Sequence, residues 1–578
     1  MHDAVDRRAE ESLRAAVDVD RLRTDVDAFE GLERVSGTDD EWEAAEYVIE
    51  RLDEAGVSAD LLTAETLVSV PEDARIEVTK PRAKTIDAAI TTSFSGSTPA
   101  AGIAGELVHV PEITEDALAR ADVENRIVIT KGFPTPEPVE RLDEGGAAAV
   151  VYESLSTDHL YEMIVTPTWG TPPYEQRDRI PTLPVVQIHQ SDAAWLTERV
   201  AGTAVELTVH TTVTTELETL PCPIGRIEGV ESDRYMIVGN HVDSWHEGIT
   251  DNATAMAATL ELARVFADAD PNRGLLFGFW PGHSTGRYAG SASFADREWL
   301  DIRENGVAYL HLDLNGLQGA DGIWYQHMAE LEDEHFDAIA AGTSLDPRDD
   351  EGSFLGDDRP GRNSDQSFWG TGVSSILSGA RLEPGTEDGG PIGGGWWWHT
   401  PADTRDKVDL NVLTEETRLF VTIASRICNA PVLPHDFRAT AAEIRETLAE
   451  IETASDRRFP EVHDRLDDLD AVLDDVYREL DTLDADTDAG TLAAAEDLQV
   501  AIGNVLVPAL YVEGDEYGQD LALPHDRLPE LRTAEALPDR SGRNRRFTEV
   551  SVQRAANRLC HRLEEAIGHA EAFLDARS

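Results

Sequence analysis

The chain has 578 residues and a formal net charge of -63, from 112 acidic residues against 49 basic ones. It is longer than one hydrophobic core usually serves, so we expect about two to four domains. Binding to nucleic acid is disfavoured, because no basic face is available to neutralise phosphates.

The acidic residues are spread along the whole chain, and only four of the basic residues are lysine. Two interpretations are open, namely a surface adapted to molar salt and recognition of a cationic partner. At about 1 M salt the Debye length is only ~3 Å, so repulsion among surface carboxylates is screened. Dispersed charge and scarce lysine favour the first interpretation, and we expect a halophilic protein typical of an acidic proteome.

The three cysteines are far apart and odd in number, which indicates neither a disulfide framework nor a cysteine zinc site. The N-terminal residues lack the apolar core of a signal peptide, and no run of about 18 apolar residues is present. We therefore expect a cytoplasmic protein without a membrane partner.

The first part of the chain, to about residue 65, is predicted to be helical and amphipathic. The run E-W-E-A-A-E-Y-V-I-E-R-L-D-E-A-G ends at Gly56, which is a typical helix-ending signal. The apolar residues on one face of this helix are Ala45, Val48, Ile49 and Leu52.

From about residue 70 to 215 the pattern changes to short β-rich runs separated by loops rich in proline and threonine. The predicted strands are 126–132, 147–154 and 183–188, with one helix over V-E-R-L-D-E-G-G-A. This pattern indicates a small β-dominated domain inserted in the chain.

From about residue 222 to 430, apolar strands alternate with helices. The predicted strands are 235–240, 275–280, 307–313 and 374–379. Near-continuous apolar strands predict an α/β domain whose sheet is covered on both faces, with ligand sites at the carboxyl ends of the strands. From about residue 431 the chain is helical and acidic, with an apolar stripe that is typical of a packing or dimerisation face.

Imidazoles and carboxylates follow several of these strands. They are His241, Asp243, Asp251, His283, Asp313 and, after a glycine-rich loop, His399. Singly, each has an ordinary explanation, such as a helix N-cap for Asp251. Jointly, at one edge of a sheet, they suit a pair of zinc-type ions about 3.5–4 Å apart that share one bridging carboxylate.

The segment H-V-D-S-W-x5-D-N-A-T, with the later H-T-P-A-D-T, resembles the co-catalytic zinc peptidases that include aminopeptidase Y, glutamate carboxypeptidase and the transferrin receptor. The resemblance implies a mixed sheet sandwiched by helices, with an inserted protease-associated domain and a helical tail. It implies a peptidase-like domain from 1–68 and 221–430, the inserted domain at 69–220 and a dimerisation-like domain at 431–578 that could form a homodimer.

The same resemblance implies the roles of the individual residues. His241, Asp251 and Asp313 would hold one Zn²⁺, Asp251 would bridge to a second, and His399 would bind that second ion. Asp243 would orient the metal side of the site, as a member of the catalytic machinery.

At one point the sequence departs from the family, which has a Glu-Glu pair after the middle strand. Here P-G-H-S places His283 and Ser284 at those positions, so no glutamate is available as general base or as ligand. His283 could fill either role, because imidazole is both a zinc ligand and a base near neutral pH. His246 and Glu247 are further candidates for a displaced base, and one ion or two could bind.

Residues that could contact substrate are also implied. N-S-D-Q-S-F-W resembles the family's S-D-H-x-x-F motif, with Asp365 in place and Gln366 where histidine is common. Arg287, Tyr288 and Trp398 are the other predicted substrate contacts. We expect a zinc-dependent metallopeptidase-like hydrolase that cleaves a peptide or small amide bond with an altered base. The alternative is a non-catalytic receptor- or scaffold-like homologue.

The acidic composition yields a first prediction. Transfer from molar salt to about 0.1 M salt lowers the midpoint of thermal unfolding, because the Debye length grows to about 10 Å and surface carboxylates then repel one another. Circular dichroism melting curves at the two salt concentrations measure this shift. Equal midpoints would contradict the halophilic interpretation.

Overall fold

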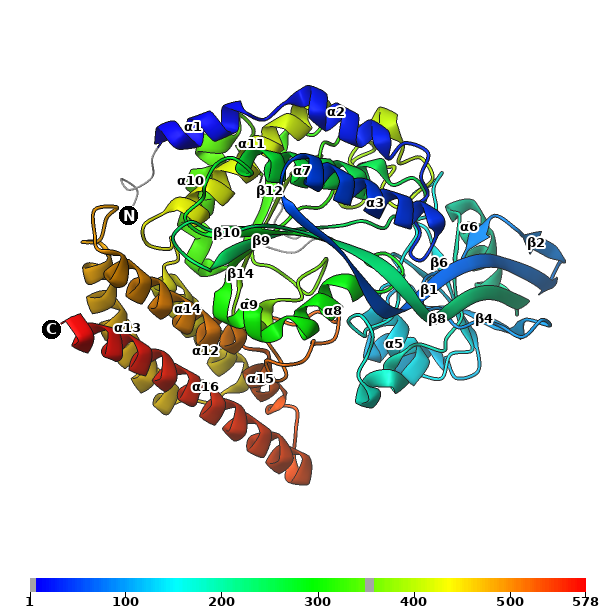
Figure 1. Cartoon of the computed structure of the whole chain (residues 1–578). Coiled ribbons are helices and arrows are strands. Elements are labelled where there is room, and N and C mark those ends of the chain that lie inside the picture. Colours follow the sequence, from blue (N-terminus) through cyan, green and yellow to red (C-terminus); the bar gives the residue numbers. More distant parts are fainter. Residues whose placement is uncertain (1–6, 349–357, 578) are drawn as a thin grey trace.

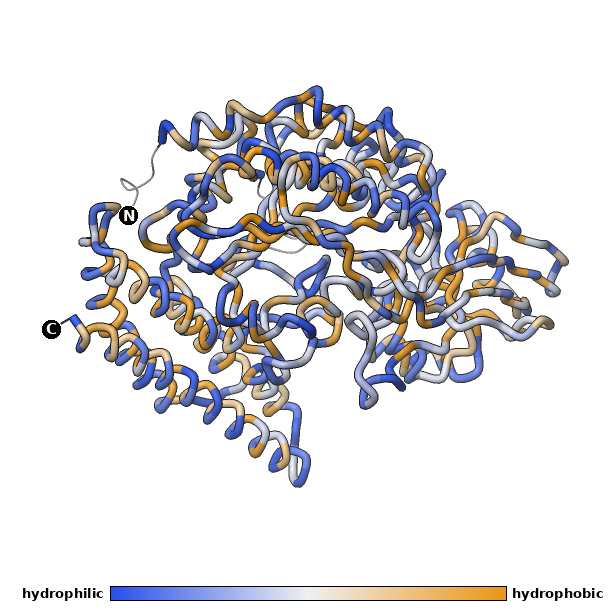
Figure 2. Tube along the Cα trace, in the orientation of Figure 1, coloured by the Kyte–Doolittle hydropathy of each residue, from blue (hydrophilic) through white to orange (hydrophobic). Residues whose placement is uncertain are grey.

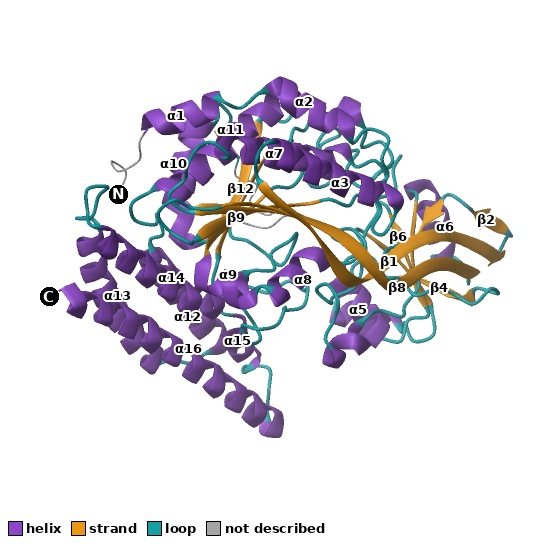
Figure 3. Cartoon of the chain, in the orientation of Figure 1, coloured by secondary structure: helices purple, strands orange, loops and turns teal. Residues whose placement is uncertain are grey.

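The computed structural model describes residues 7–348 and 358–577. Its centre is a mixed β-sheet with helices on both faces, and a group of long helices follows at the C-terminal end (Figure 1, Figure 3). This arrangement confirms the predicted α/β class and the helical C-terminal region.

Four parallel strands form the middle of the sheet, in the order β14, β11, β9, β10. Their bounds are β9 (Tyr235–His241), β10 (Gly274–Trp280), β11 (Gly306–His311) and β14 (Ser374–Arg381). Every residue in these strands is buried, as expected for strands covered on both faces. The four predicted strands are confirmed, and their carboxyl ends lie at the same edge of the sheet.

Antiparallel strands flank this group, with β12 (Gly322–His327) beside β14 and β8 (Glu206–Ile227) beside β10. The short strand β13 (Asp346–Pro347) pairs with β12. The sequence analysis does not predict β12, because G-I-W-Y-Q-H contains only three consecutive apolar residues before its polar end.

Helices cover both faces of the sheet (Figure 1). One face carries α1 (Arg7–Ala15), α2 (Val19–Ala28), α3 (Asp39–Glu54), α7 (Thr254–Phe266), α10 (Glu332–Gly342) and α11 (Leu410–Asn429). The other carries α8 (Ala289–Arg297) and α9 (Trp299–Asn305). Figure 2 shows hydrophobic residues along the central strands and hydrophilic residues on the outward turns of α1 and α2, so the apolar core lies between sheet and helices.

The N-terminal helix forms as predicted, with Ala45, Val48 and Leu52 of α3 fully buried and Ile49 only partly so. The expectation of helix to about residue 65 is wrong, because strand β1 (Ser58–Lys80) begins soon after Gly56. β1 pairs along its length with β8, about 150 residues later in the chain. A partner so far away leaves no local signal in the sequence.

The β-rich part is attached to the end of the long β1–β8 pair that lies away from the central strands (Figure 1). Its strands are β2 (Lys84–Ile86), β3 (Ala89–Ile90), β4 (Ile103–His109), β5 (Ile127–Lys131), β6 (Ala149–Glu153) and β7 (Val185–Ile188). Its helices are α4 (Glu115–Ala121), α5 (Pro136–Glu144) and α6 (Gln190–Val200). The three predicted strands in this region correspond to β5, β6 and β7.

The C-terminal helices pack on one another. They are α12 (Phe437–Ser455), α13 (Pro460–Leu480), α14 (Ala489–Tyr511), α15 (Pro529–Arg532) and α16 (Gly542–Arg577). The predicted apolar stripe of α13, which includes Leu466, Leu469 and Leu473, is buried in the core of this helical group. The stripe therefore packs within the chain, and the homodimer stays a prediction that does not rest on it.

Separate apolar clusters serve the central sheet, the β-rich part and the C-terminal helices. The four domain boundaries predicted from the sequence stay predictions. Among the described residues, none of the helices combines the length and apolar character needed to cross a membrane.

Candidate metal centre

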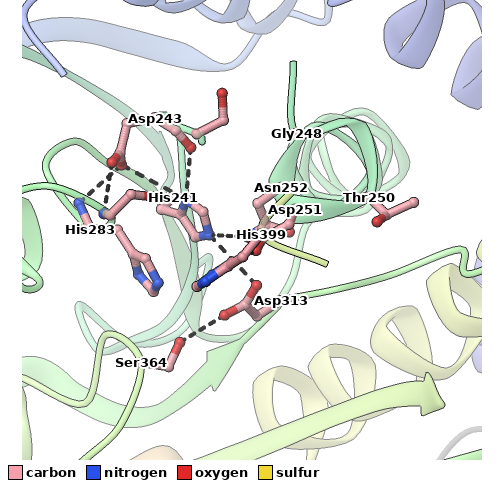
Figure 4. Close-up of polar contacts among 12 residues, drawn as sticks. His241, Asp243, Gly248, Thr250, Asp251, Asn252, His283, Asp313, Ser364 and His399 are labelled. Atoms are coloured by element: carbon pink, nitrogen blue, oxygen red, sulfur yellow. Dashed lines mark hydrogen bonds and ion pairs between the residues drawn. The ribbon is translucent and has the colours of Figure 1, made fainter. Parts of the chain in front are cut away.

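Four predicted ligands meet at the carboxyl edge of the sheet (Figure 4). His241 ends β9, and its Nε2 lies 3.1 Å from Asp251 Oδ1 and 3.6 Å from Asp313 Oδ1. Nε2 of His399 lies 3.3 Å from the other oxygen of Asp251, Oδ2. Ligand atoms bound to one zinc at about 2.0–2.2 Å are separated by about this much. Asp251 therefore faces one imidazole with each carboxylate oxygen, as a bridging ligand does.

The buried carboxylates at this site favour a bound cation. Burial opposes ionisation of Asp251 and Asp313, but the neighbouring imidazoles outweigh it and hold the pKa of both carboxyls below the usual range. Burial likewise opposes charging of His241, yet Asp251 and Asp313 raise its pKa well above the ordinary value. Asp313 Oδ1 is buried and receives no hydrogen bond from the described part of the chain. The donor set fits a zinc-type ion that replaces the proton on His241.

Main-chain carbonyls aim both imidazoles at Asp251. His241 Nδ1 lies 2.8 Å from the carbonyl oxygen of Asp243, and His399 Nδ1 lies 2.6 Å from that of Glu162. A carbonyl accepts a hydrogen bond from Nδ1–H, so each Nε2 is left with the lone pair that a metal needs. The ring of Trp398 stacks on His399 with centroids 3.6 Å apart and supports it from the side.

Asp403, in the H-T-P-A-D-T motif, fixes the backbone of the bridging residue. Its Oδ1 accepts hydrogen bonds from the backbone N–H and hydroxyl of Thr250, and its Oδ2 accepts from the backbone N–H of Asp251. Burial, together with the charge of Asp251, raises the pKa of Asp403 to about 7. The sequence analysis quotes the motif without assigning this residue, because its role depends on a backbone 150 residues away.

Asp243 differs from its predicted role. Its Oδ1 lies 3.7 Å from His241 Nδ1, beyond hydrogen-bond distance, and only its main chain orients that ring. The carboxylate instead accepts hydrogen bonds from the backbone N–H groups of His283 and Ser284 and from Ser36 Oγ. Asp243 therefore anchors the turn that carries His283 and Ser284.

His283 lies beside the first group of ligands. Its ring stacks on His241 with centroids 3.8 Å apart, and the two share a group of donor atoms within 4.8 Å of one another with Asp313. Its Nδ1 lies 2.7 Å from Asp365 Oδ2. Within residues 7–348 and 358–577, no hydrogen bond or ion pair joins His283 to Asp251 or His399.

The first ion site is therefore more complete than the second. His241, Asp251 and Asp313 offer three donors to the first predicted position, whereas the second has contacts from Asp251 and His399 alone among the described residues. Ser284 brings no carboxylate. His246 Nε2 faces Glu162 at 3.5 Å and Glu247 Oε2 accepts from the backbone of Gly31 at 3.2 Å, so both further base candidates point elsewhere.

A cavity of about 590 Å³ is lined by three of the predicted metal ligands, Asp251, Asp313 and His399. Residues from the β-rich part, the central part and the C-terminal helices all line it, including Glu137, His399 and Tyr511. Arg287, Tyr288 and Trp398, three of the predicted substrate contacts, are among the lining residues. Asp365 is not, because it is fully buried behind His283 and accepts a hydrogen bond from Ser291 Oγ.

Two arginines stand out in this cavity. Arg287 lies over the ring of Tyr288, and its buried Nε–H has no acceptor among the described residues. Arg362 stacks on Trp169 and Trp369 and donates to the carbonyls of Gln366 and Asp520. Neither forms an ion pair with a carboxylate of the described chain. The sequence analysis misses Arg362, because its position depends on loop packing.

The N-terminal segment also supports the site. Arg34 is fully buried and donates three hydrogen bonds, to the carbonyls of Val242, Glu247 and Gly248. These carbonyls belong to the loop between His241 and Asp251. The sequence analysis assigns no role to Arg34, since nothing local in L-E-R-V-S-G marks a contact to that loop.

Parts of this chain are similar in sequence to known proteins. Residues 224–424 match the model of Peptidase family M28. Aminopeptidase NAALADL1 of Mus musculus is 35% identical over 127 residues, which cover 21% of this chain and only 17% of that protein. A probable glutamate carboxypeptidase, VP8 of Zea mays, is 22% identical over 511 residues, 74% of this chain and 69% of the relative.

Solved structures agree at the level of the fold. An aminopeptidase from Aneurinibacillus sp. strain AM-1 superposes with a TM-score of 0.57 at 19% identity, over 73% of this chain and 96% of that one. A zinc aminopeptidase from Bacillus subtilis gives 0.53 at 18% identity, over 71% and 94%. The segment 224–424, which carries every predicted metal ligand, matches Peptidase family M28, and the chain has a fold similar to that of the zinc aminopeptidases.

Proposed function

We propose that this protein is a metal-dependent hydrolase that cleaves a peptide or small amide bond. The observation that carries the proposal is the position of Asp251, whose two carboxylate oxygens face His241 and His399 at the base of the cavity. The match to peptidase family M28 supports it.

The metal ligands divide between two positions. His241, Asp251 and Asp313 would hold the first zinc, and Asp251 with His399 would hold a second. When bound, zinc supplies Lewis-acid polarisation of the scissile carbonyl and lowers the pKa of the attacking water. The second position has only two protein donors, so its affinity is expected to be the weaker of the two.

We assign the general base to His283. Asp365 accepts a hydrogen bond from Ser291 Oγ and lies 2.7 Å from His283 Nδ1, so it favours the tautomer with hydrogen on Nδ1. Nε2 then has a free lone pair on a side chain that lines the cavity. In this role His283 takes a proton from the attacking water and returns it to the leaving amine as the C–N bond breaks.

The cavity favours a substrate with an acidic group. Arg287 and Arg362 line it without carboxylate partners in the described chain, although the protein carries a net charge of -63. Unpaired guanidinium groups bind carboxylates strongly and often with two hydrogen bonds. The name of the Zea mays relative, a probable glutamate carboxypeptidase, is consistent with such a substrate. The non-catalytic alternative stays open because the glutamate pair is absent.

The base assignment is tested with the full chain in molar salt and zinc, on glutamyl and aspartyl peptides and anilides. His283→Ala lowers kcat by about 10²–10⁴-fold with bound zinc unchanged, because a general base contributes that much. His241→Ala loses activity and the zinc that His241, Asp251 and Asp313 would hold. His569→Ala, an exposed histidine on α16, serves as the matched control and keeps both.

Two outcomes would contradict this account. Unchanged kcat in His283→Ala would remove the histidine from the mechanism. Zinc-loaded wild-type protein that cleaves no peptide or anilide, acidic or neutral, would favour the scaffold alternative.

The acidic specificity gives a separate prediction. Arg287→Gln raises KM for an acidic substrate about tenfold or more and leaves KM for its neutral amide analogue nearly unchanged, because a hydrogen bond to a charged group contributes about 1.5–3 kcal/mol. Arg297→Gln, on the surface of α8 and paired with Glu298, is the control. Equal changes in KM for the two substrates would refute charge recognition by Arg287.

A further inference from the structure

A pair of buried histidines lies at the end of β12, apart from the M28 ligands. His327 is the last residue of β12, and its Nδ1 lies 3.0 Å from Nδ1 of His335 on α10. Nε2 of His335 lies 2.7 Å from Ser378 Oγ on β14. Burial is the largest cause that lowers the pKa of His327 to about 2, and burial also lowers that of His335 to about 3. Both rings are therefore neutral at physiological pH.

The outer nitrogen of His327 lacks a partner. The side chain is fully buried, and in the described ranges no hydrogen bond reaches its Nε2. The carboxylate oxygen Oε2 of Glu332 lies 3.7 Å away, too far for a hydrogen bond. An N–H at this position would have no acceptor, and a lone pair would face a carboxylate. Both arrangements are unfavourable, and a cation held between the Nε2 lone pair and the carboxylate relieves the second.

A cation selects one consistent arrangement of hydrogens. His327 Nδ1–H donates to His335 Nδ1, and His335 Nε2–H donates to the hydroxyl oxygen of Ser378. The Nε2 lone pair of His327 is then directed at the carboxylates. Hydrogen bonding of the far nitrogen is the usual way in which proteins orient a metal-binding imidazole.

Two carboxylates complete the group. The donor atoms of His327, Glu332 and Asp358 all lie within 4.8 Å of one another. The histidine is fixed, whereas the side chains of Glu332 and Asp358 are 39% and 49% exposed and can close on an ion from solvent. One imidazole with two carboxylates suits zinc or manganese better than calcium, which prefers oxygen ligands alone.

Arg359 currently supplies positive charge to these carboxylates. It donates to Glu332 Oε2 at 2.6 Å, lies 3.6 Å from Asp358 Oδ2 and also donates to Glu443 Oε2 at 2.8 Å. A bound ion would compete for the first two contacts, and the third could remain. Arg359 also lines the 590 Å³ cavity, so the two positions are neighbours.

We propose that His327, Glu332 and Asp358 form an additional site for a first-row divalent transition ion such as Zn²⁺. The site is separate from the M28 ligands and does not depend on the proposed hydrolase function. Its test therefore measures bound metal and not activity.

The experiment is equilibrium dialysis of the full chain, in molar KCl, against increasing free zinc, with bound zinc counted by mass spectrometry. At the same concentration of free zinc, wild-type protein binds one more zinc ion per chain than Glu332→Gln. If the variant still binds this additional ion, it does so about tenfold or more weakly than the wild type. His327→Phe, which keeps a ring in the core, loses the same equivalent. The melting midpoint of each variant shows that it is folded.

Asp333→Asn is the matched control, because Asp333 is exposed on the same turn of α10 but does not belong to the group. It binds zinc like the wild type. The proposal is overturned if Glu332→Gln binds as many zinc ions as tightly as the wild type. It is also overturned if Asp333→Asn weakens binding equally, because zinc would then be held by surface acidity in general.

Discussion

The site depends on the placement of one carboxylate. Asp251 must present one oxygen to His241 and the other to His399, although these histidines are 158 positions apart in the chain. Asp403 holds the backbone of Asp251, and main-chain carbonyls of Asp243 and Glu162 orient the two rings. Glu162 lies in the β-rich part, so the central sheet alone does not complete the centre.

The buried charges of Asp251 and Asp313 place a second constraint on the site. Two buried carboxylates at the sheet edge are compatible with the fold only if a positive charge lies between them, and a proton on His241 or a metal ion can supply it. The carboxylate of Asp243 fixes the neighbouring turn by accepting hydrogen bonds from the backbone N–H groups of His283 and Ser284. It also accepts a hydrogen bond from Ser36 Oγ. His283 therefore lies on a well-anchored backbone, and its Nδ1 lies 2.7 Å from Asp365 Oδ2.

The sequence predicts those parts of the molecule whose signals are local. Strands β9, β10, β11 and β14 are continuous apolar runs, and His241 and Asp313 follow from their position at strand ends. The β1–β8 pair could not be predicted, because its pairing joins segments about 150 residues apart. Arg34, Glu162 and Asp403 were missed for a related reason, since they act on backbone groups that only the folded chain brings near. Asp365 was identified by its motif, but its burial behind His283 depends on three-dimensional packing.

Anomalous diffraction from zinc-soaked crystals of the full chain tests the central claim most directly. The account predicts a zinc peak about 2.0–2.2 Å from His241 Nε2, Asp251 Oδ1 and Asp313 Oδ1 together. Absence of a peak there, with His241 Nε2 still hydrogen-bonded to Asp251 in zinc-soaked crystals, would contradict it.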